Sequence, residues 1–248
     1  MKAVILAAGR GSRMKGETND KPKCLIELMG KPLLHWQLEA LQKGGVDRIL
    51  VVRGYHADKL NGDFETVDNP RWAESNMVET LRMASSWLED GPSVISYSDI
   101  VYRPEHVRAI SECDCDIAIT YDVRWERLWE LRFEDPLSDA ETFREADGRL
   151  LEIGGRAESV DEIKGQYMGL LYMTPRGWSV VDGVLSELGQ QQVDQLDMTA
   201  LLRLLLEKGV QIGVVPVEGG WVEADSMQDV MAYEEVLARD EDWGHDWR

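Results

Sequence analysis

The sequence predicts an α/β fold with a mostly parallel central sheet, helices on both faces and a small antiparallel insertion. In the first half, short apolar runs alternate with helical segments, a pattern that favours parallel strands joined by helices. The middle changes to short alternating segments with turn signals. The 248 residues, 44% of them hydrophobic, suffice for one large domain. We expect that domain to span residues 1–248, with the insertion at about 122–172.

The first half supplies the parallel strands. Residues 2–8 form an apolar run that is too short for a transmembrane helix and suits a buried strand. An amphipathic helix follows at 32–44 and ends at two glycines. Asn76 is expected to cap a helix that reaches about residue 88, with Glu79 in the capping-box position. The other expected elements are strands at 47–52, 64–67, 93–97 and 116–121, and a helix at 104–110.

The second half starts with the insertion. Alternation at 129–133, 143–145 and 150–153 predicts short antiparallel strands. A longer strand at 166–173, helices from 174 and at 198–208, a strand at 211–217 and a last helix from 226 complete the pattern. In the last helix Asp229 stands in capping-box position to Ser226. The charged tail, 239–248, is expected to be frayed, although Trp243 and Trp247 offer it docking groups.

Charge and cysteine content restrict the function. The formal net charge of −19 argues against nucleic acid and anionic membranes as partners, and leaves room for a substrate with a positive group. Cys24, Cys113 and Cys115 form no disulfide framework and have no zinc-site spacing. The sequence begins directly with a strand, without a signal peptide, and has no run of 18 apolar residues. We therefore expect a cytoplasmic enzyme.

The first 32 residues differ in charge from the rest of the chain. They hold seven Lys or Arg and three Asp or Glu, whereas the other residues carry a large negative excess. Gly9 and Gly11 end the first strand, and glycines there let backbone N–H groups approach a ligand closely. Cations beside such a loop suit an anion with several charges. The segment therefore predicts a polyphosphate site.

Two common phosphate motifs do not fit this segment. The spacing from Gly11 to Gly16 suits a Walker A loop, but Glu17 and Thr18 follow instead of Lys and Ser or Thr. A dinucleotide fingerprint needs a third glycine where Met14 stands. The segment instead resembles the nucleotidyltransferases that activate small phosphorylated metabolites. The resemblance rests on Leu6-Ala7-Ala8-Gly9-Arg10-Gly11-Ser12-Arg13-Met14 and Lys21-Pro22-Lys23-Cys24-Leu25.

The resemblance implies a Rossmann-like, three-layer fold of the GT-A-like kind and a site for a nucleoside triphosphate. It assigns the catalytic phosphate contacts to Arg13 and Lys23. Lys23 would also stabilise the negative charge that develops at the α-phosphorus. The residues expected to hold the nucleotide are Leu6, Ala7, Ala8, Gly9, Arg10, Gly11, Asn76 and Ser98.

Two carboxylates are expected to hold Mg²⁺, which such a transfer requires and which prefers oxygen ligands. Asp99 follows a strand directly, and Ser98-Asp99-Ile100 resembles the family's Gly-Asp-Ile with a serine in place of glycine. Asp225 lies in a segment, 221–226, that resembles a second family motif. Glu223 is two residues away and shares its direction if the segment is extended. Asp197, before the helix 198–208, matches the family pattern but serves equally well as a helix cap.

The acceptor side is expected in the insertion. Aromatic rings beside acids can hold an amine or a quaternary ammonium group, although most such tryptophans belong to a core or a dimer surface. The candidate acceptor residues are Trp125, Glu126, Trp129, Glu130, Tyr172 and Glu223.

The length of the chain and its last motifs are most similar to phosphocholine and 2-aminoethylphosphonate cytidylyltransferases. This implies that CTP and a phosphorylated or phosphonate amine give a CMP-linked product and pyrophosphate, with a homodimer left open. Two alternatives remain. A hexose-1-phosphate nucleotidyltransferase shares the motifs. A non-catalytic nucleotide-binding regulatory subunit should have lost a metal carboxylate or the motif lysine, and both survive here.

Overall fold

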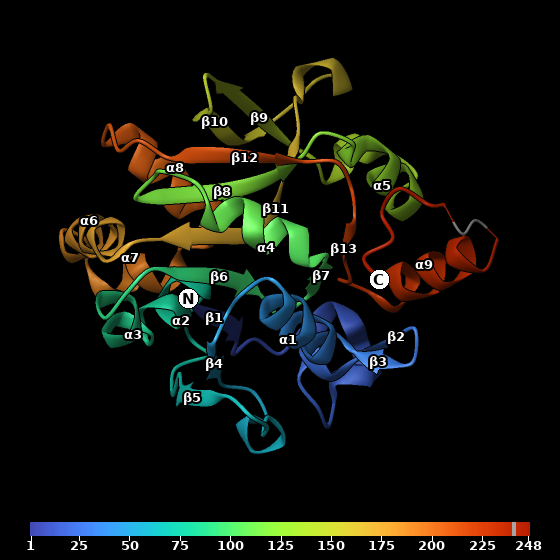
Figure 1. The fold of residues 1–248 in the computed structure, drawn as a ribbon, viewed down its shortest axis with the longest axis horizontal. Helices are drawn as coiled ribbons and strands as arrows, with labels where there is room; N and C mark the ends of the chain where they lie inside the picture. The colour runs from blue at the N-terminus through green and yellow to red at the C-terminus, as the bar shows by residue number, and fades with distance from the viewer. Residues whose placement is uncertain (240–241) are drawn as a thin grey trace.

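A twisted sheet runs through the middle of the molecule, with helices on both of its faces (Figure 1). The structure is a computed structural model that describes residues 1–239 and 242–248. The strands within these residues are β1 (Lys2–Ala7), β2 (Glu27–Leu28), β3 (Lys31–Pro32), β4 (Arg48–Arg53), β5 (Glu65–Asp68), β6 (Ser93–Tyr97), β7 (Ile100–Tyr102), β8 (Ile117–Asp122), β9 (Glu141–Ala146), β10 (Arg149–Arg156), β11 (Gln166–Met173), β12 (Gly213–Val217) and β13 (Trp221–Glu223). The α-helices are α1 (Leu33–Lys43), α2 (Met77–Arg82), α3 (Ser85–Glu89), α4 (Pro104–Ser111), α5 (Trp125–Arg132), α6 (Pro175–Ser186), α7 (Gln190–Gln195), α8 (Met198–Glu207) and α9 (Met227–Arg239).

The main sheet of the described residues has nine strands in the order β5-β4-β1-β6-β11-β8-β12-β10-β9. All of them except β10 and β11 run in the same direction, because β4, β5 and β6 continue the direction of β1 and β12 is parallel to β8. β11 is antiparallel to both of its neighbours. The predicted α/β fold with a mostly parallel sheet is therefore confirmed.

Both faces of this sheet are buried. In β1, Ala3 and Ile5 face the hydrophobic cluster that includes residues of α1, α4 and α5, whereas Val4 and Leu6 face the cluster that includes residues of α2, α3, α6 and α8. A strand buried on both sides needs an uninterrupted apolar run instead of alternation. This requirement explains the composition of residues 2–8.

A small second sheet joins the late part of the chain to the early part. β13 pairs antiparallel with β7, so that Glu223 lies opposite Ile100. The N–H of Ala224 donates to the carbonyl of Asp99 at 2.9 Å. Neither strand was predicted, because each is only three residues long. Their pairing brings the segment around Asp225 to the carboxyl end of β6.

The insertion is partly different from the prediction. The hairpin of β9 and β10 and the strand β11 are confirmed. The predicted strand at 129–133 is wrong, because these residues belong to helix α5. Its buried residues Trp125, Leu128 and Trp129 recur at helical spacing and pack into the core beside α9.

The predicted helix from Asn76 to residue 88 is broken in two. α2 ends at Arg82 and α3 begins at Ser85. The hydroxyl of Ser85 donates to the carbonyl of Arg82 at 2.5 Å, so a side chain takes the place of a helical backbone partner. The capping box is also wrong: the Asn76 side chain accepts from Met77 N, and Glu79 pairs with Arg82 at 2.9 Å.

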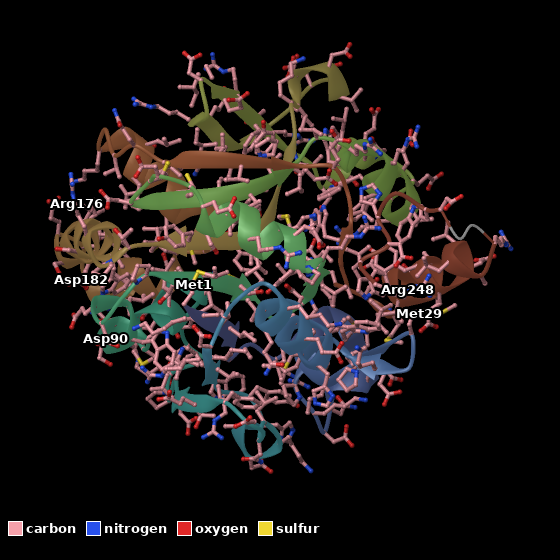
Figure 2. The ribbon with its side chains drawn as sticks, in the orientation of Figure 1. Met1, Met29, Asp90, Arg176, Asp182 and Arg248 are labelled. Carbon is pink, nitrogen blue, oxygen red and sulfur yellow. The ribbon has the colours of Figure 1, made fainter. Side chains whose placement is uncertain are left out.

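The end of the chain is docked and not frayed over residues 242–248; residues 240 and 241 of the tail lie outside the described residues. His245 is buried with its Nε2 2.9 Å from a carboxylate oxygen of Asp122. Trp247 packs edge-on against Trp36 of α1, with ring centroids 6.0 Å apart. Figure 2 shows the last residue, Arg248, on the same side of the molecule as Met29 of the β2–β3 hairpin. In the described part of the chain, no helix has the length and apolar character needed to span a membrane.

Candidate active site

The loop after β1 forms one wall of a cavity of about 270 Å³. Leu6 of β1 lines it together with Ala8, Gly9, Gly11, Ser12 and Arg13 of the loop. Gly11 has φ +70°, and a Cβ there would lie 2.6 Å from the Cβ of Lys23. Glycine is therefore required at position 11 by both its backbone conformation and the close approach of Lys23. Ala7 and Arg10 do not line this cavity: Ala7 is buried in the core, and Arg10 lies over the ring of Tyr55.

The other lining residues of this cavity come from the segment before α2, from α2 itself and from the residues that follow β6. These residues are Trp72, Ser75, Asn76, Met77, Thr80, Ser98 and Asp99. Asn76 and Ser98, predicted to contact the nucleotide, are both among these lining residues. Lys23 and Asp225 also line this cavity.

Lys23 lies between two carboxylates. Its Nζ donates to Asp99 at 2.7 Å and also to Asp225. Burial by itself lowers the pKa of Lys23, but Asp99 and Asp225 outweigh it and raise the pKa well above its ordinary value. The ammonium group that lines the cavity therefore stays charged.

Asp99, Glu223 and Asp225 bring one carboxylate oxygen each within 4.8 Å of one another. Asp99 comes from the carboxyl end of β6, and the β7–β13 pairing brings the other two to it. The Oδ1 atom of Asp99 is buried and has no hydrogen-bond partner among the described residues. A cluster of carboxylates with an unsatisfied oxygen has the donor chemistry that a hard divalent cation requires. Glu223, placed on the acceptor side by the sequence, thus belongs to this cluster as well.

The guanidinium group of Arg132, a residue not predicted from the sequence, offsets part of the negative charge of these acids. Arg132 of α5 has a side chain that is 1% exposed, and it lies 2.8 Å from Glu223, 3.3 Å from Asp229 and 3.8 Å from Asp225. Arg132 follows Trp125 by seven residues on one helix face, so a helical interpretation of this segment would have pointed to it. Asp229 also accepts from the N–H groups of Asp225 and Ser226, which confirms the predicted capping box.

The pKa of Glu223 is raised to about 7. The main cause is burial, which Arg132 opposes, while the charges of Asp225 and Asp99 add to it. The pKa of Asp225 is lowered, because Lys23 and Arg13 overcome the effect of its burial. The side chain of Arg13 contacts Asp225 directly.

A second cavity of about 250 Å³ adjoins the first, and both are lined by Arg13, Met77 and Asp225. Among the described residues that line it, the other acids are Asp139, Glu141, Asp197 and Glu223, and the aromatic residues are Tyr97, Trp129, Phe143, Tyr167 and Trp221. Burial raises the pKa of Glu141, and the nearby charges of Asp197 and Asp139 raise it further. Asp197 caps α8 by accepting from Ala200 N at 2.7 Å, and it also lines this cavity.

Only two of the predicted acceptor residues, Trp129 and Glu223, line this second cavity. Trp125 lies behind Trp129, edge-on at 5.9 Å, and Glu126 and Glu130 point to solvent. Tyr172 is paired with Ala118 at the start of β8, whereas Tyr167 of the same strand is paired with Tyr121 near its end. Their partners on β8, Tyr121 and Ala118, are three residues apart, so the two tyrosines lie about 10 Å apart along the strand. The guanidinium of Arg132 already lies over the Trp129 ring, 5.2 Å from its centroid.

Sequence comparison assigns this arrangement to a family. The profile of the MobA-like NTP transferase domain matches residues 3–160, which include the loop after β1, Lys23 and Asp99. The chain belongs to the MobA-like NTP transferase family. It is therefore a nucleotidyltransferase, and members of this class generally use a divalent metal ion.

Relatives of this NTP transferase include cytidylyltransferases. It is 34% identical over 247 residues to the CTP:phosphoglutamine cytidylyltransferase of Campylobacter jejuni, with 93% of this chain and 98% of the relative covered. It is 34% identical over 111 residues to the 2-aminoethylphosphonate cytidylyltransferase of Lancefieldella rimae, with 42% and 45% covered. The inositol-1-phosphate CTP transferase of T. maritima has a similar fold, with a TM-score of 0.74, 20% identity and 96% of each chain covered.

Proposed function

We propose that this NTP transferase is a Mg²⁺-dependent cytidylyltransferase that joins CMP from CTP to a small phosphorylated or phosphonate amine. The observation that carries the proposal is the pair of adjoining cavities. One is lined by the glycine loop and the other by acids and aromatic rings, and the two meet at Arg13 and Asp225.

In this proposal CTP occupies the first cavity. The triphosphate lies along Gly9–Gly11, where backbone N–H groups can approach it, and Arg13 and Lys23 supply positive charge. The base lies toward Trp72 and Thr80. The α-phosphate then lies near Lys23 and Asp225, at the border with the second cavity.

The carboxylates suit a magnesium ion. Asp99 and Asp225 are the proposed ligands, with Glu223 beside them, and the unsatisfied Oδ1 of Asp99 is an available donor atom. Bound Mg²⁺ would neutralise phosphate charge and polarise the phosphorus that is attacked.

The second cavity favours an acceptor with a cationic end. Arg13 is the one cation among its described lining residues, against five carboxylates. Because Arg13 lies at the border with the nucleotide cavity, the acceptor would place its phosphate or phosphonate there. Its amine would then lie toward Asp139, Glu141 and Asp197. The names of the two cytidylyltransferase relatives, one acting on phosphoglutamine and one on 2-aminoethylphosphonate, agree with such an acceptor.

The reaction needs little proton transfer by the protein. An oxygen of the acceptor phosphate or phosphonate forms a bond to the α-phosphorus of CTP. The bond from that phosphorus to the oxygen of the β-phosphate breaks, and pyrophosphate leaves. Lys23, held charged by Asp99 and Asp225, lies where it can stabilise the negative charge of the transition state. The fixed positions of Lys23 and Arg13 also orient the two reacting phosphates.

A hexose 1-phosphate acceptor is the alternative. The amide of Gln166 in the second cavity is already engaged by the backbone of Glu141, at 2.6 and 3.1 Å. A neutral sugar would bring no positive charge to the five carboxylates of this cavity, whereas an amine would. The excess of carboxylates in the cavity therefore favours the amine. A non-catalytic regulatory subunit is disfavoured, because Lys23, Asp99 and Asp225 are all present and lie together.

The test is pyrophosphate release with Mg²⁺ over four nucleoside triphosphates and a panel of acceptors. The panel holds phosphocholine, 2-aminoethylphosphonate, phosphoglutamine, inositol 1-phosphate and several sugar 1-phosphates. We expect turnover with CTP and at least one of the amines. Efficient turnover of a sugar 1-phosphate with none of the amines would refute the proposal.

A further inference from the structure

Helix α1 carries a polar side chain in the middle of its apolar face. Leu33, Gln37 and Leu41 follow one another at a spacing of four residues, so they share one face of the helix. All three are 0% exposed. Burying an amide is unfavourable unless its polar atoms are hydrogen-bonded. The amide of Gln37 therefore needs partners within the core.

The side-chain NH₂ group of Gln37 holds two carbonyl groups. Its Nε2 atom donates to the carbonyl of Tyr97 at 2.8 Å and also to the carbonyl of Ile100. Carbonyl oxygens can only accept, so the amide nitrogen must face them, and both of its hydrogens are used. The Oε1 atom of Gln37 is buried and has no hydrogen-bond partner among the described residues. Because an unpaired buried acceptor is unfavourable, the amide contributes less to stability than its two donated bonds alone would give.

The two carbonyl groups flank the turn that carries Asp99. Tyr97 ends β6 and Ile100 begins β7, and only Ser98 and Asp99 lie between them. A second donor to the Tyr97 carbonyl, the hydroxyl of Ser96 at 2.8 Å, is its neighbour in the strand and ties the turn to no other segment. β6 belongs to the main sheet, whereas β7 pairs with β13 and packs against α1 (Figure 1). One amide of α1 therefore fixes the backbone on both sides of the turn.

The position of this turn matters for the group of carboxylates. The carbonyl of Asp99 accepts from the N–H of Ala224 at 2.9 Å, and its side chain accepts from Lys23 at 2.7 Å. Asp99, Glu223 and Asp225 bring one carboxylate oxygen each within 4.8 Å of one another. Like charges at this distance repel each other. A turn that was free to rotate would let the carboxylate of Asp99 move away from the other two.

We propose that Gln37 is a positioning residue of the metal site: by holding the carbonyl groups of Tyr97 and Ile100, it keeps the carboxylate of Asp99 where a divalent ion can use it. Gln37 is not among the described residues that line the nucleotide cavity, so it acts through the backbone of the turn. Groups behind a metal ligand commonly set its orientation in this way. The inference rests on the proposed metal role of Asp99 and adds a residue on which that role depends.

The test compares Gln37→Met and Gln37→Leu with the wild type. Both changes remove the two donors, keep a side chain of similar volume and suit an apolar helix face. Gln42→Met is the matched control, because Gln42 lies on the same helix and is exposed. Asp99→Asn shows the effect of losing the metal ligand itself. Two measurements are made: hydrogen exchange of the protein alone, followed by mass spectrometry, and calorimetric binding of CTP without an acceptor, either with Mg²⁺ or with EDTA.

In the protein alone, we expect amides of residues 96–102 to exchange about tenfold faster in both Gln37 variants, while β1 and β4 exchange as in the wild type. Mg²⁺ should strengthen CTP binding to the wild type and to Gln42→Met, and Asp99→Asn should lose this gain. In both Gln37 variants the gain should shrink by about tenfold or vanish. Their affinity for CTP in EDTA should stay that of the wild type, whereas a general loss of structure would weaken that binding as well.

Unchanged exchange at residues 96–102 in both Gln37 variants overturns the inference, and so does an undiminished gain from Mg²⁺. Unfolding of both variants also overturns it, because the amide would then serve the fold as a whole. A gain that is absent in the wild type, or that survives in Asp99→Asn, refutes the proposed metal ligand and the inference with it. Failure of the inference alone therefore gives a different result from failure of the proposed function.

Discussion

The Nζ atom of Lys23 lies 2.7 Å from a carboxylate oxygen of Asp99, 76 residues away in sequence, and the same atom also donates to Asp225, 202 residues away. One ammonium group therefore joins three segments of the chain. They are the segment after β1, which carries Lys23, the residues after β6, which include Asp99, and the residues after β13, which include Asp225. The arrangement couples the lysine that would contact the phosphates to the acids that would hold the metal ion. The first two predictions concern this group of residues.

Asp99→Asn and Asp225→Asn should each lower kcat by on the order of a hundredfold or more while the protein stays folded. Each amide keeps the shape of the side chain but loses the charge that a divalent ion requires. Steady-state kinetics against Mg²⁺ concentration, with circular dichroism to check folding, measures the effect. Full activity of either variant at limiting Mg²⁺ would remove that residue from the metal site.

Lys23→Ala should lower kcat far more than it raises KM for the nucleotide, because the charge is needed most in the transition state. Lys21 is the matched control within the same motif: its side chain is not among the described residues that line the nucleotide cavity. Lys21→Ala should therefore have the smaller effect. Steady-state kinetics of both variants with CTP measures the two effects. A larger loss of kcat in Lys21→Ala than in Lys23→Ala would assign the catalytic phosphate contact to Lys21 instead of Lys23.

Glu141→Gln and Asp197→Asn should each raise the KM of an amine acceptor by about tenfold, since each removes a charge from the second cavity. The KM for CTP should not change. Glu130→Gln is the control, because Glu130 is exposed on α5 and outside the described lining residues. Acceptor and CTP titrations of the three variants give the comparison. Acceptor KM values that are unchanged in both cavity variants would contradict an amine at this position.

Trp247→Ala should lower the free energy of unfolding by about 3–5 kcal/mol. The ring of Trp247 is buried against Trp36, and its loss leaves a cavity under the docked tail. Met231→Ala on α9 is the control: Met231 is 64% exposed, so the change should stay within about 0.5 kcal/mol. Urea unfolding of the two variants measures both values. A Trp247→Ala protein as stable as the wild type would mean that the tail is not docked in solution.

Acidification should destabilise the protein partly through His106. Burial lowers the pKa of this histidine to about 4 in the folded state, against its ordinary value of 6.5. Between these pH values the unfolded chain binds the proton more readily, so stability falls as pH drops from about 6.5 toward 4. This contribution amounts to about 2 kcal/mol between pH 7 and pH 5.

The measurement is urea unfolding of the wild type and His106→Gln at both pH values. From pH 7 to pH 5, the free energy of unfolding of His106→Gln should fall by about 2 kcal/mol less than that of the wild type. His35→Gln, at an exposed position on α1, should behave as the wild type. Identical pH dependence in the wild type and His106→Gln would show that His106 is not buried in a neutral form.

Local patterns determined much of the fold. The apolar run of residues 2–8, the strand 166–173 and the helix from Met198 are short-range features that residue type and spacing define. The same holds for the glycines at the end of β1, because a positive φ at Gly11 depends on residue type. Where two short-range patterns compete, as in α5, helical spacing at Trp125, Leu128 and Trp129 prevailed over apparent alternation.

The sequence by itself thus determined the α/β architecture, the glycine-containing loop after β1 and the candidate metal carboxylates, because each depends on a motif of a few adjacent residues. Only the tertiary structure decided which distant groups meet. Arg132 balances Glu223 and Asp225 because α5 packs beside α9, and Asp139, Glu141 and Asp197 share a cavity because β9, β11 and α8 converge there. Such contacts depend on packing between segments far apart in the chain, so no local pattern at either partner specifies them.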